Sequence, residues 1–151
     1  MVEEKVSGRG QPVRKSLQKN EILRGDKRFQ LIVREGKTLR AGTMLCSYKI
    51  NPCSETNLRP IIRAGFSVPR RIVKKAIDRN KVKRLMRESY RLNKDMISED
   101  VNKSDFCLDI LFVFRGKSDS KQRYLKLSDV QPDITRCLEQ LRERIAGRNK
   151  Q

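Results

Sequence analysis

The pattern of apolar and polar residues predicts three helices and three strands. The first helix is predicted before Gly36, where Phe29, Ile32 and Val33 are apolar at helical spacing. Asp26 is its candidate N-cap, and Gly36 stands where a left-handed C-cap is expected. A short amphipathic helix is therefore expected near the N-terminus.

Three segments have the character of strands. Residues 43–50 and 61–68 are rich in β-compatible side chains, and each is followed by a proline within two residues. We expect them to form an antiparallel pair joined by a polar loop. Residues 106–114 are almost continuously apolar, which is typical of a central strand covered on both faces.

The last helix is predicted from a second apolar repeat. Ser128 and Gln131 have the spacing of a capping box, and Pro132 is tolerable in a first helical turn. The helical repeat comprises Ile134, Cys137, Leu138, Leu141 and Ile145. This helix is expected to end near Gly147, and residues 98–104 are expected to be a polar linker.

These elements predict a single α+β domain in which helices pack against a small sheet. Residues 1–20 are polar and basic without apolar periodicity, so we expect a disordered basic arm. The domain is assigned to residues 21–146, and residues 147–151 form a basic tail.

Basic residues are concentrated between the second and third predicted strands. Residues 70–91 contain ten Lys and Arg against Asp78 and Glu88, a net charge of +8. We expect residues 70–75 to form a turn that leads into a helix, with Asp78 near the positive end of its dipole. One side of this helix carries Val82, Leu85, Met86, Ser89, Asn93 and Met96. The other carries Asn80, Lys83, Arg84, Arg87, Arg91 and Lys94.

Composition narrows the function further. The 151 residues include 36 Lys and Arg, 18 Asp and Glu and no histidine, so the formal charge is +18. Without histidine there is no histidine base, no Ser-His-Asp or Cys-His pair and no histidine metal ligand. The cysteines at 46, 53, 107 and 137 form no Cys-x2-Cys pair, and those at 46, 107 and 137 are expected in the core. With no apolar signal or spanning segment, a soluble cytoplasmic protein is expected.

The uniform charge of the basic helix favours a nucleic-acid partner over a merely solvated face. Cations four residues apart, such as Lys83 with Arg87, repel each other by a few tenths of a kcal/mol. Phosphates as neighbours would relieve that repulsion. Asn80 could contact RNA or only its own helix surface, and both alternatives remain open.

The segment from Arg63 to Glu88 resembles the signature of the bacterial ribonuclease P protein subunit. The family hallmark, Arg-Asn-Arg-x-Lys-Arg-x-x-Arg-Glu, is matched from Arg79 to Glu88 and follows a Gly-x-Ser-Val strand and a basic pair, here Arg70 and Arg71. The resemblance extends over about residues 23–141. Lys81 replaces the usual arginine, which removes the guanidinium fork at that position.

The resemblance implies an α-β-β-β-α-β-α sandwich with a left-handed crossover. A third early strand would then be residues 58–62 or a division of residues 43–68. It further implies the small subunit of a ribonucleoprotein that removes the 5′ leader of precursor tRNA. Catalysis and the required Mg²⁺ would belong to the RNA subunit, with no metal and no catalytic residue on this chain.

The resemblance also implies two RNA-binding surfaces. The catalytic RNA would face Arg79, Asn80, Lys81, Lys83, Arg84 and Arg87. The precursor leader would lie between the first helix and the sheet, against Phe29, Tyr48, Arg70 and Arg71. Phe29 could equally be a core residue, because Val33 follows it at helical spacing.

Other classes of function remain as alternatives. A structural ribosomal protein that binds rRNA would share the small size, high charge and basic tail. A DNA-binding regulator is disfavoured because no helix-turn-helix pattern precedes the basic helix. A self-sufficient nuclease is disfavoured because Asp105 and Asp109 form no constellation with Asp78 or Glu88, and exposed helix or strand-edge positions explain them better.

Overall fold

A computed structural model describes residues 17, 19–23, 25–52, 60–116 and 126–149 of the chain. The predicted basic arm lies almost wholly outside these residues, as do Cys53, residues 58 and 59 of the alternative strand and the end of the predicted tail. Leu17 already packs against the core, and the last helix continues to Asn149.

Four strands form one sheet in the order β1-β2-β4-β3. They are β1 (Lys37–Ala41), β2 (Met44–Pro52), β3 (Ile62–Ser67) and β4 (Phe106–Phe114). Strand β4 pairs antiparallel with β2 and parallel with β3, so its predicted central position is confirmed. The expected pairing of β2 directly with β3 is wrong, because β4 lies between them. A parallel neighbour needs a long crossover, which here contains two helices.

The additional early strand is β1, and neither predicted location for it is correct. It pairs antiparallel with β2 through a tight turn at Gly42. Only Leu39 and Ala41 of its five residues are buried, as suits a short edge strand. Such a weak period-two pattern is difficult to detect among charged residues.

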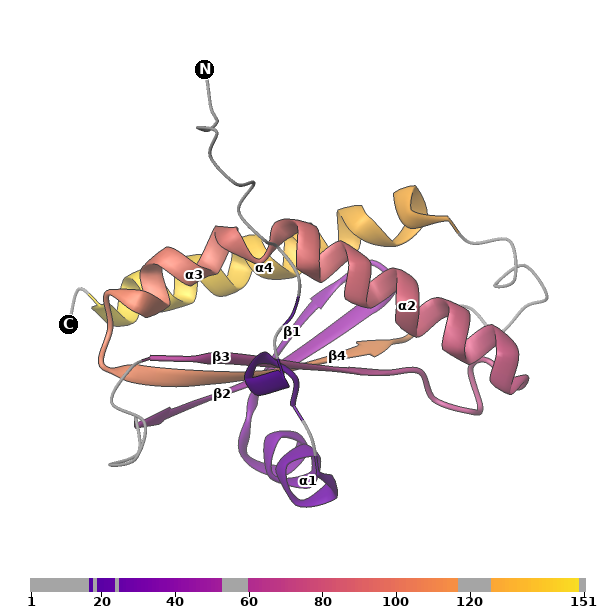
Figure 1. Cartoon of the computed structure of the whole chain (residues 1–151), viewed down its shortest axis with the longest axis horizontal. Coiled ribbons are helices and arrows are strands. Elements are labelled where there is room, and N and C mark those ends of the chain that lie inside the picture. The colour runs from indigo at the N-terminus through magenta and orange to yellow at the C-terminus, as the bar shows by residue number, and fades with distance from the viewer. Residues whose placement is uncertain (1–16, 18, 24, 53–59, 117–125, 150–151) are drawn as a thin grey trace.

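Helices cover both faces of the sheet (Figure 1). Helix α1 (Asp26–Glu35) lies on one face, whereas α2 (Ala76–Asn93), α3 (Asp95–Asn102) and α4 (Leu127–Asn149) lie on the other. A short 3-10 helix, η1 (Lys19–Glu21), precedes α1. The observed order is the predicted α-β-β-β-α-β-α with α3 added.

Two details of the helices differ from the sequence-based prediction. Most of the segment expected to be a polar linker is α3, which buries Ile97 and Val101. Helix α4 begins at Leu127, before the predicted capping box. The backbone N–H of Lys126 donates to the Asp129 carboxylate at 2.8 Å, so Asp129 provides the cap and Pro132 falls in the second turn.

The main core fills the space between the sheet and α2, α3 and α4. Its aromatic centre is Tyr90 of α2, which contacts Phe66 of β3 and Phe112 of β4 with ring centroids 5.9 and 5.7 Å away. The predicted burial of Cys46, Cys107 and Cys137 is confirmed. Burial of Tyr90 anchors the inner side of α2 and thereby fixes which side faces outward.

A second, smaller cluster holds α1 on the opposite face. Leu23, Ile32 and Leu111 are buried there, and Phe29 and Val113 pack against them. Val33 is 69% exposed, so its predicted place in the apolar stripe is wrong. Of these three residues, only Phe29 and Ile32 belong to the cluster.

Both predicted caps of α1 differ from the structure. Gly25, with φ of 96°, precedes the helix, and Asp26 is its first residue. Gly36 is the C-cap but has φ of −75° and ψ of 162°, which is extended and not left-handed. A Cβ at Gly36 would lie 2.5 Å from the carbonyl oxygen of Ile32 and 2.8 Å from that of Tyr48. Glycine is therefore required by close backbone approach.

Candidate nucleic-acid interface

Helix α2 has an apolar and a basic side, as its sequence predicts, but it ends at Asn93, so that Lys94 lies in the turn after it and Met96 belongs to α3. Val82, Met86, Ser89 and Tyr90 are buried against the sheet and α4. On the outer side, Asn80, Arg84 and Arg87 are exposed and Lys83 is half-buried. The buried stripe fixes the rotation of the helix, so the basic stripe necessarily faces away from the core.

Several cations of this region are already engaged within the protein. Arg79 donates to the carbonyl oxygens of Val73 and Lys74 at 3.1 and 2.6 Å, and so closes the turn before α2. Arg91 binds Glu88 through two hydrogen bonds, and Lys94 pairs with Glu21 at 3.1 Å. The hydrogen bond from Arg91 lowers the pKa of the Glu88 carboxyl, which remains ionised. Arg79 consequently has a structural task besides any contact with RNA.

The remaining outward cations form what we call the α2 basic stripe, made of Lys83, Arg84 and Arg87. Within the described part of the chain, no acidic side chain pairs with any of them. Lys83 and Arg87 are four residues apart and repel each other on the helix surface. The stripe is thus a cationic surface whose counter-charge must come from outside these residues.

The loop before α2 adds further positive charge. Residues 70–75 form the predicted turn between β3 and α2, and Arg70 and Arg71 are both exposed in it. Lys74 and Lys75 are exposed as well. Asp78 lies in the first turn of α2, as predicted, where it favours the helix dipole.

On the opposite face of the sheet, Phe29 lies at the edge of the small cluster. It is half-buried, which leaves part of its ring accessible. The ring sits over Gly65 of β3, where an added Cβ would come within 3.1 Å of Phe29 Cε1. Phe29 therefore packs against the small cluster and still presents an aromatic surface, and its contact with the leader stays a prediction.

Tyr48 does not share a surface with Phe29. Its side chain is 3% exposed and lies on the side of the sheet covered by α4. The guanidinium of Arg144 donates to the Tyr48 hydroxyl at 3.2 Å and lies over its ring. The assignment of Tyr48 to the leader surface is corrected, because alternate residues of a strand face opposite sides and Tyr48 has the inward phase.

A polar network beyond α1 is a feature that the sequence analysis missed. The buried carboxylate of Asp109 accepts from Arg63 Nε at 3.1 Å and from Asn51 Nδ2 at 3.2 Å. Lys49 in turn donates to Asn51 at 2.8 Å. Asp109 is therefore buried on the central strand and is not exposed as expected. Its partners come from two other strands, β2 and β3, and no local motif could reveal that pairing.

The described residues offer no evident catalytic constellation. They contain no group of three or more acidic or cysteine side chains arranged to hold a metal ion. Asp109 is occupied by Arg63 and Asn51, and Glu88 by Arg91. Among the described helices, none has the length and apolarity needed to cross a bilayer.

Comparison with known proteins gives a consistent family. A family model described as Ribonuclease P matches residues 17–142. The ribonuclease P protein component of Chlorobaculum tepidum is 33% identical over 109 residues, which cover 70% of this chain and 71% of that protein. The component from Clostridium botulinum strain Loch Maree is 34% identical over 103 residues, covering 68% of this chain and 81% of its own.

The fold has a matching solved structure. The RNase P protein from Thermotoga maritima aligns with a TM-score of 0.60 and 28% identity, over 80% of this chain and 96% of that one. None of these relatives is a ribosomal protein, so the comparisons give the ribosomal alternative no support.

Proposed function

The chain belongs to the ribonuclease P protein family, and we propose that it binds both the catalytic RNA and the precursor tRNA during removal of the 5′ leader. It is the protein component of the ribonucleoprotein, whose partner is the ribonuclease P RNA. The two RNA contacts use opposite sides of the sheet. Helix α2 faces the catalytic RNA, and the side that carries α1 faces the leader.

The α2 basic stripe is the observation that supports contact with the catalytic RNA. Lys83, Arg84 and Arg87 project from a helix whose other side is locked into the core, and no described acid neutralises them. Each phosphate contact would release condensed counterions, so binding at this stripe is strongly salt-dependent. Arg79 contributes by holding the turn that starts α2.

The leader contact is supported by Phe29 with Arg70 and Arg71. A partly accessible aromatic ring offers a stacking surface to an unpaired base, and exposed arginines attract its phosphates. Tyr48 is left out of this surface because it is buried beneath α4. The polar network on the same side of the sheet includes Arg63 and Lys49.

In this proposal the protein supplies binding and the RNA supplies chemistry. The chain has no histidine, and Asp109, a buried carboxylate on the sheet, is held by Arg63 and Asn51. Hydrolysis and the Mg²⁺ that supports it are assigned to the RNA subunit. Protein cations then reduce the repulsion between two RNAs, and less Mg²⁺ is needed to hold them together.

Reconstitution with a bacterial ribonuclease P RNA and a precursor tRNA tests the proposal. Cleavage is measured against Mg²⁺ concentration with the full chain, without protein, and with the Lys83→Ala, Arg84→Ala, Arg87→Ala triple variant as control. The full chain should shift the Mg²⁺ requirement to lower concentration, and the triple variant should lose most of that shift. A cleavage curve that the full chain leaves unchanged would contradict the proposal and would suit a protein that only binds rRNA.

A further inference from the structure

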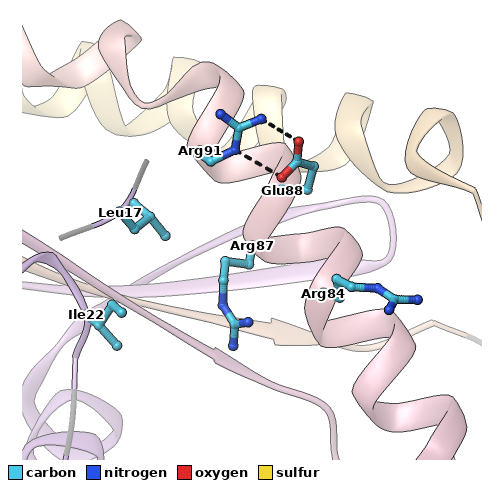
Figure 2. A pocket seen from close by; sticks show the side chains of 6 residues that line it. All are labelled: Leu17, Ile22, Arg84, Arg87, Glu88 and Arg91. Carbon is cyan, nitrogen blue, oxygen red and sulfur yellow. Dashed lines mark hydrogen bonds and ion pairs between the residues drawn. The ribbon is translucent and has the colours of Figure 1, made fainter. Parts of the chain in front are cut away.

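A pocket of about 270 Å³ lies between the N-terminal segment and the flank of α2 (Figure 2). It is lined by Leu17, Ile22, Arg84, Arg87, Glu88 and Arg91. The four residues from α2 are spaced i, i+3, i+4 and i+7, so they form one continuous side of the helix. The pocket therefore borders the α2 basic stripe. Its other lining residues include Leu17, Ile22 and Arg91, which lie outside the hallmark segment.

The N-terminal wall of this pocket is fixed to the fold. Ile22 forms a parallel bridge with Ala64 of β3, and the N–H of Leu23 donates to the Ala64 carbonyl at 3.0 Å. Glu21 pairs at 3.1 Å with Lys94, the residue that follows α2, and Leu17 packs against the main core. The apolar side chains of Leu17 and Ile22 are thus held at a set place opposite the arginines.

The pocket combines three kinds of surface. Leu17 and Ile22 are half-buried and apolar, Arg84 and Arg87 are cations without an acidic partner among the described residues, and Glu88 is an ionised carboxylate. A nucleotide has the complementary division, with an apolar base face, an anionic phosphate and a hydrogen-bonding base edge.

Glu88 is the group that distinguishes this pocket from a simple phosphate site. Glu88 is already paired with Arg91, and its carboxylate would repel a phosphate, so this part of the pocket suits a hydrogen-bond donor of a ligand and not its phosphate. Arg91 uses one acceptor position on each oxygen, at 3.0 Å for Oε2, and holds the group in place. A carboxylate can accept about four hydrogen bonds, so further positions remain for N–H groups of a base.

We propose that this pocket binds one unpaired nucleotide of the RNA that docks on α2, and that it prefers a base with an exocyclic amino group. The base packs on Leu17 and Ile22, its amino group donates to Glu88, and its phosphate is bound by Arg84 and Arg87. The inference rests on the proposed function, because it assumes that α2 faces RNA. A paired base has its hydrogen-bonding edge occupied, so only an unpaired one can reach Glu88.

Chemical footprinting of the reconstituted holoenzyme tests this inference. Dimethyl sulfate and kethoxal probe the base edges of adenine, cytosine and guanine in the catalytic RNA and the precursor. The full chain should shield one unpaired nucleotide that the Leu17→Ala, Ile22→Ala double variant leaves reactive. Ile77→Ala is the matched control, because Ile77 is 76% exposed on the same helix and does not line the pocket.

The footprint separates this inference from the proposed function. If both variants shield the same nucleotides as the full chain, the pocket holds no base and the inference is overturned. If the full chain protects no RNA at all, the proposed function itself fails.

A second variant avoids any change in packing. Glu88→Gln should weaken assembly by about tenfold, the effect of one lost hydrogen bond to a charged acceptor. Its matched control is Glu99→Gln, since Glu99 also belongs to an exposed helical ion pair, with Lys103 at 3.1 Å, but lies outside the pocket. Replacing the shielded nucleotide by uridine should weaken the full chain by a similar factor and leave Glu88→Gln unaffected. Equal assembly by Glu88→Gln and Glu99→Gln would overturn the preference for an amino group.

Discussion

At the scale of single residues, Gly36 shows how α1 is joined to the sheet. The sequence suggests a left-handed cap there, but the backbone is extended and its N–H donates to the Ile32 carbonyl at 2.8 Å. What excludes a side chain is the crowding of two carbonyl oxygens, from α1 and from β2. The residue therefore sets the distance between the helix and the strand beside it.

Gly36→Ala should destabilise the fold by about 1 to 3 kcal/mol, because the added methyl group meets backbone that cannot rotate away. Gly147→Ala is the control, since a Cβ at that position meets nothing within 4 Å. In a helix that substitution should stabilise by up to about 1 kcal/mol. Thermal and urea unfolding of both variants measure the difference, and equal effects would show that crowding at Gly36 is unimportant.

Because of Tyr90, the free energy of unfolding should depend on pH in the alkaline range. Burial, and secondarily the charge of Glu21, raises the pKa of the Tyr90 phenol above its ordinary value near 10. The unfolded chain therefore releases this proton before the folded one does. The stabilisation is complete below about pH 10 and is lost as pH rises from there toward the folded pKa, at about 1.4 kcal/mol per pH unit.

The Tyr90→Phe variant lacks this titration. Its stability difference from the unmodified protein should be constant between about pH 7 and 9 and should shift in favour of the variant above about pH 10. Urea unfolding at several pH values provides the measurement, and lysine titration cancels in the comparison. A difference that stays constant to pH 11 would indicate that the phenol is not buried as described.

At the scale of elements, the sequence predicts those segments whose pattern is strong and local. Strand β4 is recognisable because both of its faces are buried, and α2 because apolar and basic residues separate cleanly on one helix. Strand β1 and helix α3 are missed because they are short and bury only two residues each. Strand order is missed for another reason: β4 inserts between β2 and β3 from 39 residues beyond the end of β3.

In the candidate site, too, features that follow from a local pattern could be predicted, and features that depend on distant contacts could not. The outward residues of α2 can be predicted from one helical repeat, and the structure agrees for Asn80, Arg84 and Arg87, which are exposed. Lys94, predicted on the same side, lies beyond the end of α2 and pairs with Glu21. The burial of Tyr48, the task of Arg79 in the turn and the network around Asp109 depend on contacts with other parts of the fold. Leu17 and Ile22 could not be linked to α2 from sequence, since more than 60 residues separate the two walls of the pocket.

Helix α1 carries a prediction about the leader. Phe29→Ala should reduce affinity of the holoenzyme for leader-bearing precursor by about fivefold or more, because one stacking contact contributes roughly 1 to 3 kcal/mol. Affinity for mature tRNA should change little. Ile32→Val is the matched control, since Ile32 is 1% exposed in the same cluster and offers no surface to RNA. Equal losses of affinity for precursor and mature tRNA would indicate that Phe29 has only a structural role.

At the scale of the whole molecule, the sheet lies between the two proposed RNA-binding surfaces. Figure 1 shows α1 on one side and α2, α3 and α4 on the other. The formal charge of +18 would attract any polyanion. Because the apolar side of α2 is buried, the α2 basic stripe faces outward as one defined cationic surface. The central claim is that Lys83, Arg84 and Arg87 bind phosphates of the catalytic RNA.

The salt dependence of holoenzyme assembly tests that claim most directly. The dissociation constant for the catalytic RNA is measured from low to high salt for the full chain and for the Lys83→Ala, Arg84→Ala, Arg87→Ala variant. A second triple variant, Lys103→Ala, Lys126→Ala and Arg136→Ala, removes the same amount of charge from exposed residues away from α2. Lys103 follows α3, Lys126 precedes α4 and Arg136 lies on α4. The α2 variant should lower the log–log slope by about 2 to 3, and the second variant should leave it near that of the full chain. Equal slopes for the full chain and the α2 variant would place the RNA interface elsewhere.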